Sequence, residues 1–310
     1  MLMFATLLLA LLIDRLWGEP PAAVHPVVGM GQYLQWAGKH VTSLPPYAAF
    51  AAGAAAWCGG ALAAGALAFW AQGLILTHVH PLLAAIPLAI ALKCMLSWRM
   101  LRGEVLAVEN ALQHSLQAGR ERLSWLVSRD TAHLSESEVR ESAIESLAEN
   151  LNDSVVAPIF WFVLLGLPGA AIYRFANTAD AMWGYRGVYK GQNWEWAGKW
   201  AARADDVLSW LPARLTAVLL AVAAGGLPRK ALGDEAIKTP SPNSGWPMAA
   251  MALALGITLR KPGVYVLNPL GRPAAASDTA AAQVYASNAV FTLTLIASIA
   301  ILLIAIVISP

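Results

Sequence analysis

Long apolar runs separated by polar connectors make up most of this 310-residue chain. A helix needs about 20 predominantly apolar residues to cross a bilayer. Runs of that kind lie at 46–76, 81–98, 155–173, 207–228 and 289–309. The pattern therefore predicts an all-α fold, a polytopic membrane helical bundle.

Two further segments and one interruption refine this prediction. Residues 2–17 are apolar up to Asp14 but lack a basic n-region and a cleavage site, so we expect a retained helix and five or six spans in total. Residues 247–259 are too short to span and predict a half-helix or an interfacial segment. The run 155–173 holds residues that permit a broken or re-entrant helix: Pro158, Gly166, Pro168 and Gly169.

The basic residues predict an orientation for the bundle. Lys and Arg gather in four polar stretches, 14–45, 99–154, 174–206 and 229–288. The THVH turn at 77–80, which joins two apolar runs into a helical hairpin, has neither. Because cytoplasmic loops carry the excess of Lys and Arg, we expect this turn outside and 99–154 as a cytoplasmic helical insertion. Residues 1–310 then form one integral domain of the cell (inner) membrane.

Composition excludes several classes of protein. Hydrophobic residues make up 58% of the chain and charged residues 13%, against about 25% charged in soluble domains. The formal net charge of +2 provides no basic field for nucleic acid, so the bilayer is the expected partner. Cys58 and Cys94 form no Cys-x-x-Cys motif. These counts exclude a soluble enzyme, a disulfide framework and a nucleic-acid binder.

Tryptophan is unusually frequent, with 13 residues in the chain. Several lie near the ends of apolar runs, where an interfacial aromatic belt is expected. A flat ligand stacked on the connector 174–206 is the alternative, and the belt is the simpler interpretation.

Residues 135–150 predict an amphipathic helix. Ser135 and Glu138 have the S-x-x-E spacing of a capping box. An apolar stripe follows at Val139, Ala143 and Leu147. The helix therefore has one face for packing and leaves another for polar side chains.

That polar face is acidic and leads to a membrane boundary. Glu141, Glu145 and Glu149 recur every four residues, and Asp153 continues the row up to the apolar segment that starts at Val155. The row is either a solvated acidic face or a functional site. We favour the site, because carboxylates at a membrane boundary need a cation partner and oxygen ligands suit Mg²⁺ with substrate phosphates.

Two Asn-x-x-Asp elements flank the segment 155–173. Asn150 and Asp153 precede it, and Asn177 and Asp180 follow it. A tetrapeptide of this kind is common by chance. If the two elements converge, Asp180 closes a metal–phosphate site formed with the acidic row.

A third polar group lies at the run 207–228. Arg203, Asp205 and Asp206 precede it and Arg214 is inside it. An intramembrane Arg usually faces a partner or an anionic ligand. Because Arg214 follows Asp206 by about two helical turns, we expect them to share a face, as a phosphate-binding column or as a structural ion pair.

Isolated polar positions complete the candidate set. His25 lies in a Pro-rich turn, Arg129 and Asp130 lie in a linker, and Ser241 and Asn243 lie in a turn before the half-helix. Such turns can bind phosphate, but they are also common as purely structural elements. The chain has no Walker motif, so a nucleotide has to bind without one.

The motifs LLIDRLWGEP, HPV, SRDT, ESLAENLNDSVVAP, ANTADAMWGY, ARADDVLSWLPARL and SPNSGWPMAAMALALGI occur in this order. Together they resemble the CobD/CbiB family, membrane proteins of the cobalamin pathway known as cobinamide or adenosylcobinamide-phosphate synthases. The resemblance runs from about residue 9 to about residue 260. Residues 261–272 match the family's Tyr/Gly-rich stretch only loosely, so no ligand contact is assigned to them.

The resemblance implies a reaction in which the corrinoid adenosylcobyric acid is joined as an amide to (R)-1-amino-2-propanol or its O-phosphate. It implies ATP as co-substrate and Mg²⁺ to shield the phosphate charge. Catalytic and metal-binding roles then fall to Glu145, Glu149, Asp153 and Asp180. Substrate and phosphate binding fall to His25, Arg129, Asp130, Asn150, Asn177, Tyr185, Arg203, Asp205, Asp206, Arg214, Ser241 and Asn243. Composition and spacing alone indicate only a membrane protein with an acidic, metal-like site.

Two other classes of function stay open. A UbiA-like prenyltransferase would have intact Asp-rich diphosphate motifs, but Val156 stands where a second Asp is needed. A non-catalytic membrane partner or sensor would have an eroded polar set, whereas this one is dense. The sequence leaves open whether the amino alcohol is phosphorylated and whether the chain forms a homo-oligomer.

Overall fold

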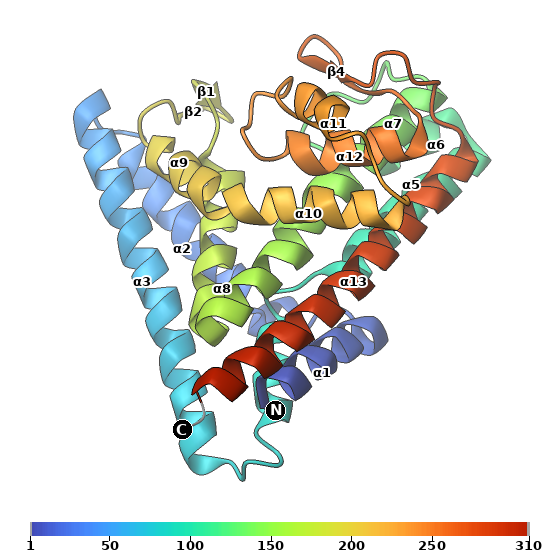
Figure 1. Ribbon diagram of the computed structural model, residues 1–310. Coiled ribbons are helices and arrows are strands. Elements are labelled where there is room, and N and C mark those ends of the chain that lie inside the picture. The colour runs from blue at the N-terminus through green and yellow to red at the C-terminus, as the bar shows by residue number, and fades with distance from the viewer. Residues whose placement is uncertain (1, 309–310) are drawn as a thin grey trace. The chain divides into compact units, whose positions relative to one another are not determined.

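The computed structural model describes residues 2–308, with side chains for residues 2–303. Helices dominate this part of the chain, and its only strands form two short antiparallel hairpins (Figure 1). Three helices are long and apolar enough to cross a membrane. The prediction of an all-α membrane bundle is confirmed. The chain divides into two compact units, each assembled from segments far apart in the sequence.

Unit 1 contains the chain up to Ser97, Ala157–Ser209 and the end of the last helix from Ala297. Its elements are α1 (Leu2–Trp17), a 3₁₀ turn (Ala22–Val24), α2 (Pro26–Val41), α3 (Pro46–His78), α4 (Ala85–Lys93), α8 (Ala157–Trp183), β1 (Val188–Tyr189), β2 (Gln192–Asn193) and α9 (Lys199–Leu208). Helix α3 packs on α8 and α9, α1 on α4, and α2 on α3 and α8. Aromatic side chains such as Trp57, Phe175 and Trp183 fill the core.

Unit 2 contains Trp98–Val156 and Trp210–Ile296. Its elements are α5 (Trp98–His114), α6 (Leu116–Leu123), α7 (Glu136–Leu151), a π-helical turn (Asn152–Val156), α10 (Trp210–Ala223), α11 (Arg229–Ala236), α12 (Gly245–Leu255), β3 (Leu259–Lys261), β4 (Tyr265–Leu267) and the first part of α13 (Ala276–Ile308). Helix α12 packs on α7, α10 and α11, and α5 packs on α6 and α7. The predicted insertion 99–154 thus shares one core with residues 210–296.

The expected number of spans was too high. By length and composition, the described residues contain helices able to cross a membrane at Pro46–His78, Glu136–Trp183 and Ala276–Leu303. The bent pair α9 and α10 makes a possible fourth. The predicted span 289–309 falls on α13, and residue 309 lies outside the described residues.

The predicted span 81–98 is wrong. Only Ala85–Lys93 is helical there, which gives a helix of about 14 Å, half of what a bilayer requires. Leu88, Ala89 and Leu92 are fully buried, and α4 packs on α1. One face of the apolar run therefore belongs to the protein core, although Ile86 and Ile90 on the other face are about half exposed, and the helix by itself is too short to cross a bilayer.

The predicted span 207–228 is not one straight helix, and the bent pair that contains most of it starts earlier, at Lys199. Helix α9 ends at Leu208 and α10 starts at Trp210, with a bend of 48° between them. Pro212 lies in the first turn of α10, where the missing N–H costs no hydrogen bond. The chain therefore changes direction just where the motif WLPARL begins.

Helix α8 is broken as the Gly and Pro residues predicted. Gly166 adopts φ 68° and ψ −157°, a conformation that strongly favours glycine, and Pro168 follows it. The freed N–H of Leu167 donates to Oε1 of Gln72 on α3, at 3.0 Å. A side chain of the neighbouring helix thus replaces the lost backbone partner, as the bilayer interior demands.

Candidate functional site

The acidic row lies on α7, and its first half is buried. The helix starts as predicted, because Ser135 and Glu138 form a reciprocal capping box. Val139, Ala143 and Leu147 are fully buried, as the apolar stripe required. Glu141 is also 0% exposed and Glu145 only 4%. A solvated acidic face is therefore excluded for these two carboxylates.

Glu145 is held by groups from two other parts of unit 2. Nη2 of Arg129 and the hydroxyl of Tyr265 each donate to its Oε1, both at 2.7 Å. Its other oxygen, Oε2, is buried and has no hydrogen-bond partner among the described residues. Burial, and then the Glu145 carboxylate, raise the pKa of Tyr265 well above its usual value, so the phenol stays a donor. The trio therefore leaves one carboxylate oxygen with unused acceptor capacity.

The β3–β4 hairpin brings Tyr265 to α7. Nε of Arg260 donates to Oε2 of Glu141 at 2.8 Å, and Nη1 of Arg129 donates to the backbone oxygen of Arg260 at 3.2 Å. Arg129 therefore contacts both the hairpin and the helix. These bonds attach the hairpin to the part of α7 that carries Glu141 and Glu145.

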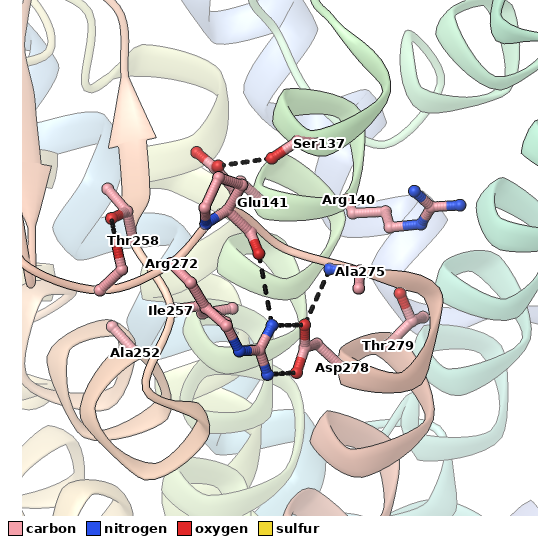
Figure 2. A network of polar contacts seen from close by, with 12 residues as sticks. Ser137, Arg140, Glu141, Ala252, Ile257, Thr258, Arg272, Ala275, Asp278 and Thr279 are labelled. Atoms are coloured by element: carbon pink, nitrogen blue, oxygen red, sulfur yellow. Dashed lines mark hydrogen bonds and ion pairs between the residues drawn. The ribbon is translucent and has the colours of Figure 1, made fainter.

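Two further contacts fix the chain that follows β4. Asn268, which follows β4 with φ 47°, donates its backbone N–H to Glu235 on α11 at 2.7 Å. Figure 2 shows the next anchor, in which two nitrogens of Arg272 donate to the two carboxylate oxygens of Asp278 on α13, each at 2.6 Å. Figure 2 also shows Ser137 donating to Glu141. The hairpin is thereby a fixed part of unit 2.

The end of α7 connects the acidic row to α10. Asn150 donates to Ser146 on its own helix. In the π-helical turn, Nδ2 of Asn152 donates to Oδ1 of Asp153 at 2.8 Å, while its Oδ1 accepts from the Thr216 hydroxyl at 3.1 Å. A π turn inserted in a helix is frequent at functional sites. Asp153 is therefore oriented by a neighbour that is itself fixed to the helix carrying Arg214.

Arg214 has different surroundings from those predicted. It lies near the start of α10, beyond the bend, so the expected straight face shared with Asp206 does not form. Its Nη1 donates to Oδ1 of Asn243 at 2.7 Å and its Nη2 to the oxygen of Pro242 at 3.1 Å. The guanidinium carbon lies 4.5 Å from the ring centre of Trp210 and 4.9 Å from that of Trp246. Arg214 thus holds the 241–244 turn.

That turn is organised by its own side chains. Oγ of Ser241 accepts the backbone N–H groups of Asn243 and Ser244, at 3.2 and 3.3 Å. Asn243 is 4% exposed. Ser241, Asn243 and Arg214 are therefore brought together by the structure, as one polar group.

Two predicted site residues of unit 2 remain, Asp130 and Glu149. Asp130 is exposed and accepts the backbone N–H of Ala132 at 2.9 Å, which is a local turn contact. Glu149 is half-buried on the last turn of α7. The charge of Glu149 adds to the rise in the pKa of Tyr265, so Glu149 belongs to the electrostatic surroundings of the Glu145 trio.

The other predicted residues belong to unit 1. Asn177 and Asp180 are half-buried on α8, and Asp180 lies against Gly184, where any Cβ would lie 2.1 Å from its Oδ1. Tyr185 follows directly. Because Asp180 and the α7 row lie in different units, the convergence of the two Asn-x-x-Asp elements stays a prediction.

The residues of α9 form a loose group. Arg203 is exposed and its Nη1 lies 3.8 Å from Asp206. Asp205 accepts a hydrogen bond from Ser209 at the bend, at 3.4 Å. An exposed pair at this distance adds little stability.

His25 is part of a buried charged network that the sequence did not predict. Its Nδ1 accepts the N–H of Val27 and caps α2, and its Nε2 lies 3.0 Å from Glu19. Lys93 reaches Glu19 at 2.8 Å and Asp14 at 3.4 Å. Lys93 and Asp14 are almost completely buried. The histidine is therefore one member of an ion network inside unit 1.

A resident metal does not fit the described residues. No three His, Cys, Asp or Glu side chains of this part of the chain come together to hold an ion. Glu145 already accepts from Arg129 and Tyr265. Magnesium usually binds through one or two carboxylates and substrate phosphates, so it would have to arrive with a nucleotide.

The residues that sequence reasoning missed are partners from distant segments. Tyr265 lies in the stretch to which no contact was assigned, and Arg260 directly precedes that stretch. Glu109 accepts two nitrogens of Arg140 and the hydroxyl of Thr279. One signal was present: Arg and Glu are nearly balanced in unit 2, and buried carboxylates require such partners.

Comparison with known proteins decides the family. The family described as CobD/Cbib protein matches residues 7–304. The chain belongs to the CobD/CbiB family. A probable cobalamin biosynthesis protein CobD of Methanothermobacter thermautotrophicus is 41% identical over 274 residues, covering 85% of this chain and 86% of the relative. That of Pyrococcus furiosus is 41% identical over 261 residues, covering 84% and 86%.

A bacterial relative agrees with these. The cobalamin biosynthesis protein CobD of Stutzerimonas stutzeri is 39% identical over 269 residues, covering 86% of this chain and 84% of the relative. No solved structure matches the chain significantly. Membership of the CobD/CbiB family implies a role in cobalamin biosynthesis and makes the prenyltransferase alternative unnecessary.

Proposed function

We propose that this protein joins the carboxylate of adenosylcobyric acid to (R)-1-amino-2-propanol, or its O-phosphate, in an ATP-dependent amide ligation. The chain's family and the names of its relatives support the pathway. The observation that carries the reaction type is the Arg129–Glu145–Tyr265 trio, which pairs a guanidinium with a buried carboxylate of unused acceptor capacity.

The reaction has two balanced steps. An oxygen of the substrate carboxylate attacks the γ-phosphorus of ATP, giving an acyl phosphate and releasing ADP. The amine nitrogen then attacks the acyl carbon, the C–N bond forms, and phosphate leaves as the C–O bond breaks. The amine gives up one proton, which a general base has to accept.

We assign the proton acceptor to Glu145. Its Oε2 is the free acceptor, while Arg129 and Tyr265 hold its Oε1 and fix the carboxylate plane. Arg129 also carries a positive charge that suits a phosphate or a carboxylate of the substrate. Glu149 and Asp153, at the end of the same helix, are proposed to face the nucleotide. The catalytic role predicted for Asp180, in unit 1, is proposed on the sequence pattern alone. Magnesium belongs to the substrate, MgATP.

The second group, Arg214 with the 241–244 turn, is proposed to bind phosphate. Ser241 and Asn243 supply polar side chains, and Arg214 fixes the turn that carries them. Arg214 retains donors beyond those used in its bonds to Trp210, Pro242 and Asn243, because a guanidinium has five N–H groups. Its role is therefore to position the turn and to add charge.

The decisive experiment is reconstitution with purified full-length protein. Adenosylcobyric acid, the amino alcohol with or without its phosphate, and MgATP are supplied, and amide product and ADP are measured together. We expect ADP release only with both the acid and the amine, in a one-to-one ratio with amide. ADP release without either substrate, or no amide with both, contradicts the proposal and favours a non-catalytic partner.

Variants of the trio connect activity to the site. Glu145→Gln keeps the size and most hydrogen-bonding capacity of the side chain but removes its basicity, so we expect a loss of at least about a hundredfold in kcat. Glu136→Gln is the matched control, since Glu136 is exposed and on the same helix. Unchanged kcat in Glu145→Gln removes Glu145 from the mechanism.

We also propose that the protein resides in the cell (inner) membrane with 99–154 in the cytoplasm. The distribution of Lys and Arg supports this orientation. Cys at position 135, in a Ser135→Cys variant lacking the native cysteines, should react with an impermeant thiol reagent only after lysis. Labelling of intact cells contradicts the orientation.

A further inference from the structure

A cavity of about 500 Å³ lies in unit 1 where α8 ends. Its walls are one face of α2, the last turn of α8 and the β1–β2 hairpin. Lys39 and Lys190 line it, and none of its lining residues is acidic. Two lysines and no acidic residue line the cavity, and a carboxylate outside the lining, that of Asp180, acts on Tyr185. This charge balance favours an anion.

The other polar groups of the cavity can all donate hydrogen bonds. Gln35 and Gln192 contribute side-chain amides, and Tyr185 and Tyr189 contribute hydroxyls. The oxygens of a phosphate accept hydrogen bonds and offer few donors in return. The cavity therefore matches a phosphate group in hydrogen bonding as well as in charge.

The turn of the hairpin holds Lys190 in an unfavourable backbone conformation. Tyr189 and Gln192 pair across the hairpin, so Lys190 and Gly191 form its two-residue loop, with φ of 48° and 78°. Such loops favour Asn-Gly, because both residues need positive φ. A lysine there carries backbone strain, and residues with strained backbone cluster at ligand-binding sites.

The cavity also stabilises negative charge on one of its own groups. The rings of Tyr185 and Tyr189 stack with centres 3.6 Å apart and planes 13° apart. The hydrogen bond from Tyr185, and then the charge of Lys190, lower the pKa of the Tyr189 hydroxyl. Burial, and then that hydrogen bond, raise the pKa of Tyr185 to about 12, so Tyr185 remains the donor.

We propose that this cavity is a phosphate-ester site in which Lys39 and Lys190 bind the phosphate oxygens. Two sources supply this chemistry, a soluble phosphate monoester and the headgroup of an anionic phospholipid. The candidate span that contains α8 ends at Trp183, at the edge of the cavity, and basic pockets at such positions bind lipid headgroups. The proposal concerns binding only and stands whether or not the chain forms the amide.

The test uses the full-length protein with two probes. O-Phosphoethanolamine represents the soluble source and is titrated by calorimetry in a non-ionic detergent. Vesicles of phosphatidylglycerol, against phosphatidylcholine, represent the lipid source, and thermal stabilisation is measured. In the double variant Lys39→Gln, Lys190→Asn we expect binding at least about tenfold weaker, because each charge-assisted hydrogen bond is worth about that factor or more. Asn tolerates positive φ, so the hairpin is retained.

Lys199→Gln is the control, because Lys199 belongs to the same unit, lies 4.5 Å from the ring centre of Trp196 and does not line the cavity. It should bind both probes within about twofold of the native protein. Loss of the soluble ester alone identifies a small-molecule site, and loss of the lipid effect alone identifies a headgroup site. The proposal is overturned if neither probe acts on the native protein, or if Lys199→Gln weakens binding as much as the double variant.

Discussion

The two units neutralise their buried acids in different ways. In unit 2 each buried carboxylate has an arginine of its own: Glu109 has Arg140, Glu141 has Arg260, Glu145 has Arg129 and Asp278 has Arg272. In unit 1 Asp14 and Glu19 share the single ammonium of Lys93, with His25 beside Glu19.

The difference determines how many carboxylates lose their counter-ion when one cation is removed. Arg140, Arg260 and Arg272 each give two nitrogens to their buried carboxylate, and Arg129 gives one nitrogen to Glu145 and one to a backbone oxygen, so each arginine fixes the orientation of its acid. A shared lysine is a point charge that compensates two acids at once and orients neither. Removing one arginine therefore strands one buried carboxylate, whereas removing Lys93 takes the lysine charge from two, of which Glu19 keeps His25 beside it. Unit 2 has the arrangement of an oriented polar site, and unit 1 that of a structural ion cluster.

The largest effect is expected for Lys93→Met. It leaves Asp14, which is fully buried, and Glu19 without their cation, and breaking a buried pair costs about 3–5 kcal/mol. Thermal unfolding in detergent measures the loss. Lys230→Met, at an exposed lysine of α11, is the control and should leave the unfolding temperature nearly unchanged. A small loss in Lys93→Met would mean that one shared cation is dispensable.

Arg129→Gln should destabilise the protein less, by about 3 kcal/mol, because it strands only Glu145 and Tyr265 still donates to that carboxylate. Arg260→Gln is the matched comparison. Arg260 is 37% exposed, but its partner Glu141 is 0% exposed and keeps only Ser137 as a donor, so a loss of about 3 kcal/mol is expected here as well. A loss well below that in Arg260→Gln alone would show that exposure of the cation, and not burial of the carboxylate, governs these pairs.

Tyr265→Phe removes one donor to Glu145 and should cost about 1.5 kcal/mol at neutral pH. The native protein should also show a pH dependence of this contribution. Because the pKa of Tyr265 is raised on folding, its contribution is complete below the unfolded tyrosine pKa of about 10 and is lost as the pH rises beyond it. Between pH 8 and 11, the free energy of unfolding should fall less steeply with pH in the variant than in the native protein.

Arg214→Lys gives the smallest expected loss of stability, about 1 kcal/mol, because lysine keeps the charge but cannot reach both Asn243 and Pro242 in one plane. The proposed phosphate role predicts, in addition, a raised KM for ATP or aminopropanol phosphate. Normal kinetics in the folded variant would restrict Arg214 to holding the turn.

Local features of unit 2 were predictable from sequence and long-range ones were not. The capping box at Ser135 and the four-residue spacing of Glu141 and Glu145 determine α7 and its faces from neighbouring residues alone. The partner of each carboxylate comes from a segment that only folding brings near, as Tyr265 shows, 120 residues beyond Glu145. The acidic residues of α7 indicated that cationic partners were needed, but not which residues provide them.

The errors in the membrane segments have a common physical cause. Apolar runs fill protein cores as well as bilayers, and hydropathy does not separate the two. In 81–98 the signal against a span was Lys93, which is paired with acids of α1 and of the segment after it. In 207–228 it was Pro212, which marks the start of a helix and not its middle.

The break at Gly166 has a consequence for biogenesis. Helix α3 leaves the ribosome well before α8, so Gln72 enters the lipid phase before the N–H group that its amide oxygen will accept has been synthesised. When α8 arrives, its unpaired Leu167 N–H and the waiting amide satisfy each other. The order of synthesis thus makes α3 a template for membrane integration of α8. Replacing Gln72 by leucine should delay that integration and expose nascent α8 to quality-control proteolysis.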